Sequence, residues 1–160
     1  MRARITTAMA LAALMGLCLA APARALADSP EKYFQNSHDR LTALSAAAGK
    51  LFSDIQNPAE KITANYLTLV GGLRAASADL IAQFLEINDH LRDPKDLAYV
   101  QAKIDALRQD LPSVIKTDIK RLTEIAGVNK NQDIAKLADD IAKELKVLLN
   151  NLENLSFPQP

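Results

Sequence analysis

The sequence predicts an all-α protein, folded as an antiparallel up-down-up-down bundle of four long helices. Two observations predict this class. Apolar residues recur at intervals of three and four along four successive stretches, and no stretch alternates apolar and polar residues long enough to favour a strand. Three prolines each follow a good helix-capping residue, so that three helix starts can be located. The one or two residues left between the first helices allow only an antiparallel return.

The three capped prolines predict helix starts near residues 30, 58 and 94. A side-chain oxygen at the N-cap accepts a hydrogen bond from a free backbone N–H, and the proline that follows has no N–H to leave unpaired. Gly127 is expected to end the third helix, and Asn129 with Gln132 resembles a capping box that opens a fourth. The capped pairs are Ser29-Pro30, Asn57-Pro58 and Asp93-Pro94.

Each helix is expected to bury one row of apolar residues. In the first helix the row is Phe34, Leu41, Leu44, Ala48, Leu51 and Ile55. In the second it is Ile62, Tyr66, Leu69, Leu73, Ala76, Leu80, Phe84, Ile87 and Leu91. In the third it is Leu97, Val100, Ile104, Leu107, Leu111, Val114, Ile119, Leu122 and Ile125. In the fourth it is Ile134, Ala138, Ile141, Leu145, Leu148, Leu152 and Leu155.

Pro112 conflicts with this pattern, because a proline inside a helix removes a hydrogen bond and clashes with the preceding turn. The apolar row nevertheless stays in phase from Leu107 through Leu111 to Val114. We therefore expect the third helix to be kinked at Pro112 rather than broken in two. In the second helix, Gly71-Gly72 indicates a close helix crossing at Ala75, Ala76 and Ser77, with a small-residue groove for a ligand or partner as the alternative.

Residues 1–27 have the three parts of a secretory signal peptide. The segment begins with two arginines, continues with an apolar run over residues 5–21, and ends with the small-x-small triplet Ala25-Leu26-Ala27. Signal peptidase is therefore expected to cut before Asp28.

Two alternatives to this cleavage stay open. A retained membrane anchor needs about 20 apolar residues, and the run is slightly shorter than that. Lipoprotein processing would use Cys18, but the bulky Leu17 stands where a small residue normally precedes the lipidated cysteine. We expect one helical-bundle domain at residues 28–156, a flexible tail at residues 157–160, and a periplasmic or secreted location in a bacterium.

Charge and sulfur content exclude several classes of function. The chain balances 19 basic against 19 acidic residues, and its leader holds three arginines but no acid, so the expected exported chain is mildly acidic. This balance gives no support to a nucleic-acid-binding surface. The single cysteine and all three methionines lie in the leader. The exported chain would therefore form no disulfide and would offer no thiolate or thioether ligand.

Glu86, His90 and Asp93 are the candidate metal ligands. They are spaced i, i+4 and i+7, so they share one helix face, and carboxylate and imidazole ligands suit zinc, iron or manganese. The paired Glu-x-x-His motifs of di-iron bundles are absent. The competing interpretation is a solvated helix end, with Asp93 serving as a cap.

A haem held by both histidines is disfavoured. His38 and His90 would lie about 18 Å apart along the bundle at the rise of an α-helix, which is too far for both to reach one iron. On the third helix, alternating charges are typical of a solvated face, although such a patch can also contact anionic lipid head groups. The charges are Lys116, Asp118, Lys120, Arg121, Glu124 and Lys130.

No nucleophile elbow, phosphate-binding glycine loop or His-Glu-x-x-His motif occurs, so we expect no enzyme activity and no cofactor. The favoured hypothesis is an exported, non-enzymatic protein of the bacterial envelope that acts by protein–protein interaction or as a structural subunit. One alternative is a carrier of a small ligand, metal or haem within the bundle. A second is an amphipathic protein that binds a lipid surface. A monomer is favoured over a homodimer.

Overall fold

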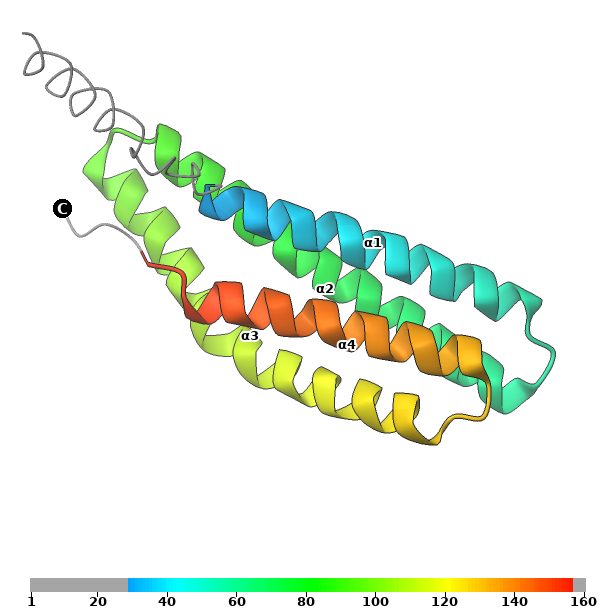
Figure 1. Ribbon diagram of the computed structural model, residues 1–160. Coiled ribbons are helices and arrows are strands. Elements are labelled where there is room, and N and C mark those ends of the chain that lie inside the picture. The colour runs from blue at the N-terminus through cyan, green and yellow to red at the C-terminus, as the bar shows by residue number, and fades with distance from the viewer. Residues whose placement is uncertain (1–28, 157–160) are drawn as a thin grey trace, which may run out of the picture.

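The computed structural model describes residues 29–156, which contain four α-helices (Figure 1). No strand occurs among the described residues. The prediction of an all-α four-helix protein is therefore confirmed. The expected signal peptide at residues 1–27 and the expected tail at residues 157–160 lie outside the described part of the chain. The helices are α1 (Pro30–Asp54), α2 (Pro58–His90), α3 (Pro94–Val128) and α4 (Gln132–Glu153).

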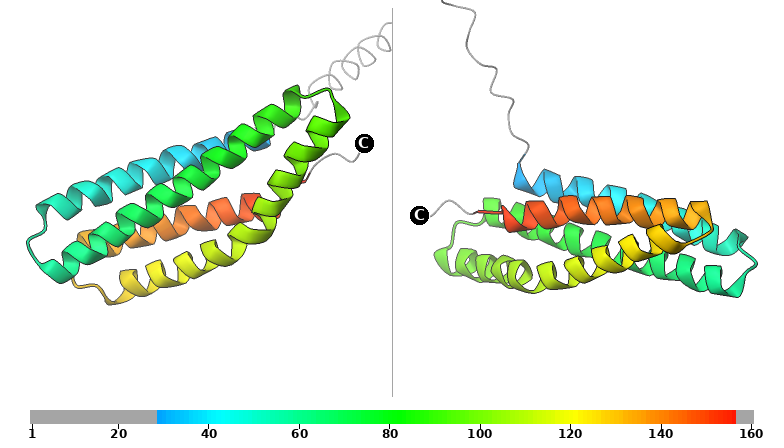
Figure 2. Two further views of the ribbon diagram at one scale, coloured as in Figure 1. Left: turned by 180° about the vertical axis from the view of Figure 1, so that it is seen from behind. Right: turned by 60° about the horizontal axis from the view of Figure 1, so that its bottom comes forward.

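Successive helices run antiparallel (Figures 1 and 2), as their short connections require. α1 packs against α2 along most of its length and also against α4, while α3 packs mainly on α4. The contact between α2 and α3 is much less extensive. The α2–α3 hairpin reaches beyond the neighbouring ends of α1 and α4 (Figure 1). One side of α2 is therefore only partly covered by the rest of the bundle.

The predicted starts of the first three helices are confirmed, but their caps differ. The Asn57 side chain accepts hydrogen bonds from the backbone N–H groups of Ala59 at 3.0 Å and Glu60 at 3.4 Å. Asp93 accepts one from the backbone N–H of Lys95 at 2.8 Å. Ser29 makes no such bond, so α1 begins at its proline without a side-chain cap.

The predicted boundary between α3 and α4 was wrong in detail. α3 continues through Gly127 to Val128, and none of residues 29–156 has the positive φ that a glycine C-cap uses. Asn131 rather than Asn129 caps α4, because its side chain accepts hydrogen bonds from the first free N–H groups of that helix. The Asn129 side chain instead accepts a bond from the Asn131 N–H at 2.9 Å.

α3 stays one helix through Pro112, so it is not broken in two there. Its path bends between its first and second halves (Figures 1 and 2). A missing N–H and a ring that crowds the preceding turn are a sufficient physical cause for a bend at this position.

The buried rows predicted for α1 and α4 are largely confirmed. In α1, Phe34, Leu41 and Ala48 are buried, and Ile55 closes the row just beyond the helix. In α4 every predicted position is buried. These residues are Ile134, Ala138, Ile141, Leu145, Leu148 and Leu152, followed by Leu155 after the helix.

The row predicted for α2 was largely wrong. Tyr66, Phe84 and Leu91 pack partly buried against the core, but most of the predicted row faces outward. The helix buries a different face that combines Leu67, Ile81 and Leu85 with alanines. In α3 most of the predicted row packs in the core, but Val114 is exposed and its neighbour Ile115 is buried instead. Small residues bring α1 and α2 close together, and a helix that is apolar on two faces does not reveal from its sequence which face is buried.

α1 and α2 cross closely at Gly71 itself, one turn before the crossing predicted at Ala75, Ala76 and Ser77. A Cβ atom placed on Gly71 would lie 3.0 Å from the Cβ and 3.2 Å from the Cα of Ser45 on α1. The Ser45 hydroxyl donates a hydrogen bond to the Thr68 carbonyl at 2.8 Å, which fixes the two helices at this level. Glycine is therefore needed here for close approach rather than for an unusual backbone conformation.

Candidate functional site

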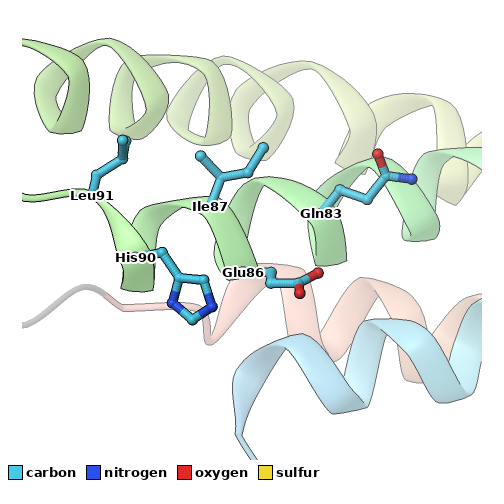
Figure 3. Close-up of a pocket in the computed structure, with 5 residues that line it drawn as sticks. All are labelled: Gln83, Glu86, Ile87, His90 and Leu91. Carbon is cyan, nitrogen blue, oxygen red and sulfur yellow. The ribbon is translucent and has the colours of Figure 1, made fainter.

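Two of the three predicted metal ligands, Glu86 and His90, lie at the exposed end of α2. Glu86 and His90 line a surface hollow together with Gln83, Ile87 and Leu91. In Figure 3, Glu86 and His90 extend from one side of the helix, while Ile87 and Leu91 point to the opposite side. The hollow is therefore formed along a single helix, and no second helix contributes a ligand to it among the described residues.

These three residues do not assemble into a metal site in the described chain. No group of three or more His, Cys, Asp or Glu side chains within residues 29–156 is placed to hold a metal ion. Asp93 lies beyond the end of α2 and accepts its hydrogen bond from the Lys95 N–H. The geometry thus agrees with the competing interpretation of a capped, solvated helix end.

The two histidines lie far apart and share no contact. The Nδ1–H of His38 donates a hydrogen bond to the Ala75 carbonyl at 3.1 Å, since a carbonyl can only accept. His90 lies on the same helix as Ala75, about 22 Å further along at the rise of an α-helix. His38 therefore joins α1 to α2 and shares no binding position with His90.

Two buried carboxylates pair across helix interfaces, and neither pairing is indicated by the spacing of residues in the chain. The Nε–H of Arg74 donates to Asp118 at 2.7 Å, which joins α2 to α3. The Ser37 hydroxyl donates to Glu144 at 2.8 Å, and Arg40 approaches its other oxygen at 3.4 Å, which joins α1 to α4. Asp118 was expected on a solvated face; it is buried instead, because its partner comes from another helix.

These contacts form a polar belt around the middle of the bundle. Arg74 is next to Ala75, whose carbonyl bonds His38, and His38 is next to Ser37, which bonds Glu144. Polar contacts thus pass from α3 to α2, then to α1 and on to α4. Each buried charge has a partner, so the belt opposes any sliding of one helix along another. Its groups are engaged with one another, as expected of a structural feature.

Outside this belt, Lys143 of α4 forms a local surface pair on its own helix. The ammonium group of Lys143 lies 2.6 Å from a carboxylate oxygen of Asp139 and 3.9 Å from Asp140. Its pKa is raised above the ordinary lysine value, first by the hydrogen bond to Asp139 and then by the negative charges of both aspartates. The lysine side chain is exposed, so this pairing makes no buried group.

The most distinctive surface feature is a row of exposed apolar residues on α2, here called the α2 stripe. The exposed fractions are 72% for Ile62, 55% for Leu69, 61% for Leu73, 42% for Leu80 and 45% for Ile87. The stripe extends about 38 Å at the rise of an α-helix. Single exposed apolar residues are ordinary, whereas a continuous row indicates a contact surface.

The α2 stripe is also nearly free of charge. Between Lys61 and Glu86 the only charged residues of α2 are Arg74 and Asp79. Arg74 is bonded inward to Asp118, and Asp79 accepts a hydrogen bond from the Gln83 amide at 2.7 Å. Neither Arg74 nor Asp79 therefore forms a salt bridge across the outer face of the stripe. Depletion of charge at the centre of a patch is typical of protein–protein interfaces.

Comparison with protein-family models, with curated protein sequences and with solved structures finds no match to this chain. Among the described residues, no helix is both long enough and apolar enough to cross a membrane. The class of protein that fold and surface define is thus a four-helix bundle with one unpartnered apolar helix face.

Proposed function

We propose that this chain is an exported, non-enzymatic helical-bundle protein that works by protein–protein contact, with the α2 stripe as its contact surface. The observation that carries the proposal is the exposure of five large aliphatic side chains in one row, led by Ile62 and Leu73. Apolar residues spaced by four and seven positions along one helix face are the pattern that a partner helix recognises.

The internal polar groups support the same proposal. Asp118, Glu144 and His38 all have partners on a neighbouring helix. Groups that are engaged in this way hold the bundle together and are not poised to transfer protons or attack a substrate. The apolar surface that remains free for contact lies on the outside of the bundle, above all on the α2 stripe.

The proposal is tested by affinity capture from cell-envelope extract with three forms of the protein. Leu73→Glu places a charge at the centre of the α2 stripe, and Val147→Glu makes the same change at the 44% exposed Val147 on α4. We expect partners, identified by mass spectrometry, that are retained by the wild type and by Val147→Glu but lost with Leu73→Glu. Equal capture by all three forms would refute the assignment of the surface.

Export is proposed from the leader-like composition of residues 1–27. The measurement is the intact mass of the protein recovered from the periplasmic fraction or medium of cells that express the full-length sequence. We expect a chain that begins at Asp28. Recovery of the protein only in the cytoplasm, with Met1 present, would contradict export and leave the contact surface on α2 to be judged separately.

A further inference from the structure

We infer that the partner of the α2 stripe is a second copy of this chain, packed antiparallel so that a two-fold axis passes between Arg74 and Ala75. The inference rests on the proposed function, because it names the occupant of the same surface. It reverses the monomer expected from the sequence, which assumed that this apolar row was buried inside the bundle.

Together with Tyr66 and Ala76 beside it, the α2 stripe has the two-row pattern of a coiled-coil helix. Two rows spaced by seven residues alternate along α2, and they share the outer face of the helix. One row is Ile62, Leu69 and Ala76; the other is Tyr66, Leu73, Leu80 and Ile87. Tyr66 is half-buried, and the other members are exposed. A helix with this pattern packs against another helix that carries the same repeat.

Antiparallel pairing gives the better fit between two copies. It places Ile62 of one copy against Ile87 of the other, and Leu69 against Leu80. At the centre it places Leu73 against Ala76 twice, so that a large side chain meets a small one. Parallel pairing would instead set Ala76 against Ala76 and leave a void at that layer, which lowers stability.

The charges beside the stripe agree with a second copy rather than a membrane. In the antiparallel pair the flanking acid Asp79 would face the uncharged Gly72, and Glu86 would face the uncharged Asn65, so no like charges meet. A helix that lies on an anionic membrane carries Lys and Arg along its polar edges. The α2 stripe has no exposed Lys or Arg between Ile62 and Glu86, since Arg74 is bonded to Asp118.

The size of the stripe predicts a reversible dimer. A face about 38 Å long and about 10 Å wide covers about 400 Å² of each copy, or about 800 Å² in total. This projected area lies below the roughly 1,000 Å² expected of a stable specific contact, in the range of weak and transient ones. We therefore expect the dimer to dissociate on dilution to micromolar concentrations rather than to be permanent.

The test is sedimentation velocity of the purified protein, produced from the full-length sequence, across a dilution series from about 100 µM to about 1 µM. We expect a dimer at the highest concentration for the wild type and for Val147→Glu, and a monomer throughout for Leu73→Glu. Circular dichroism will show that both variants keep the helix content of the wild type. A wild type that stays monomeric at every concentration, or a Leu73→Glu variant that still dimerises, overturns the inference.

Orientation is tested by disulfide formation in a Cys18→Ser background. Mixing Ile62→Cys with Ile87→Cys is expected to give a cross-linked pair, while Ile62→Cys alone gives none. Cross-linking of Ile62→Cys to itself would overturn the antiparallel arrangement. If the protein is monomeric and yet captures another envelope protein through Leu73, the second copy is excluded and the proposed function stands.

Discussion

Gly71 is the residue at which α1 and α2 depend on the absence of a side chain. A Cβ on Gly71 would meet backbone as well as side-chain atoms of Ser45, at 3.0 to 3.4 Å. Gly71→Ala should therefore lower the free energy of unfolding by about 1–3 kcal/mol through overpacking, even though alanine is the better helix former. Urea unfolding measures this change.

Gly49→Ala is the matched control on α1. Its added Cβ would lie 3.7 Å from the nearest atom of Thr68, an ordinary contact. Here the gain in helix propensity should dominate and raise the free energy of unfolding by up to about 1 kcal/mol. Equal stabilisation by Gly71→Ala and Gly49→Ala would show that the helix crossing is looser than the distances indicate.

The Arg74–Asp118 pair is the second test at the residue scale. The two side chains are only 14% and 12% exposed, so removal of one partner leaves a nearly buried charge without compensation. Asp118→Asn is expected to lower the free energy of unfolding by about 3 kcal/mol. The double variant Arg74→Met/Asp118→Leu should recover most of that loss, because it removes both charges and keeps the volume.

The control for this pair is Arg108→Ala, which breaks an exposed pair with Asp105 on the same helix. A change below about 1 kcal/mol is expected there. If the double variant is as unstable as Asp118→Asn, packing rather than the unpaired charge is the cause of the loss.

At the scale of the helices, the three proline starts look alike in sequence but differ in structure. Asn57 caps two backbone N–H groups of α2, whereas Ser29 caps none. Asn57→Ala should lower the free energy of unfolding by about 1 kcal/mol. Ser29→Ala should change it by less than about 0.5 kcal/mol, as for a surface substitution away from any special contact. Thermal and urea unfolding of the two alanine variants makes the comparison, and equal losses would contradict the assigned caps.

The helix number and the starts of the first three helices could be predicted because their signals are local. Asn57-Pro58 and Asp93-Pro94 carry the start of a helix within two residues. The choice of buried face could not be predicted for α2, because that choice depends on its neighbours. Ala64, Ala75 and Ala78 are less apolar than the leucines of the stripe, yet they are buried because they let α1 approach closely.

The α2 stripe could likewise be predicted only in part from the sequence. The residues of the α2 stripe were recognised in the sequence as one apolar row, and the structure confirms that they share a face. Their exposure could not be predicted, because periodicity locates an apolar face without showing what covers it. The polar belt was missed for a related reason, since Ser37 and Glu144 are 107 residues apart in the chain.

For the whole molecule, the belt and the stripe have complementary consequences. The belt joins all four helices at one level and satisfies buried charges such as Asp118 and Glu144 within the bundle. A bundle fixed in this way has no need to open in order to expose apolar surface, since Leu73 and its neighbours are already outside. Contact through α2 is therefore compatible with a rigid bundle, and binding should leave the helix content unchanged.

Lipid binding is the alternative that this arrangement disfavours, and flotation with vesicles tests it. Lys116 on α3 is paired with Glu153 at 2.8 Å, and no exposed basic residue lies along the α2 stripe. Without basic residues beside the apolar row, attraction to anionic lipid is weak. The purified protein is therefore expected to remain in the bottom fraction with phosphatidylglycerol-containing vesicles, even at low salt. Flotation of the wild type that is abolished by Leu73→Glu but kept by Val147→Glu would instead assign the α2 stripe to a membrane surface.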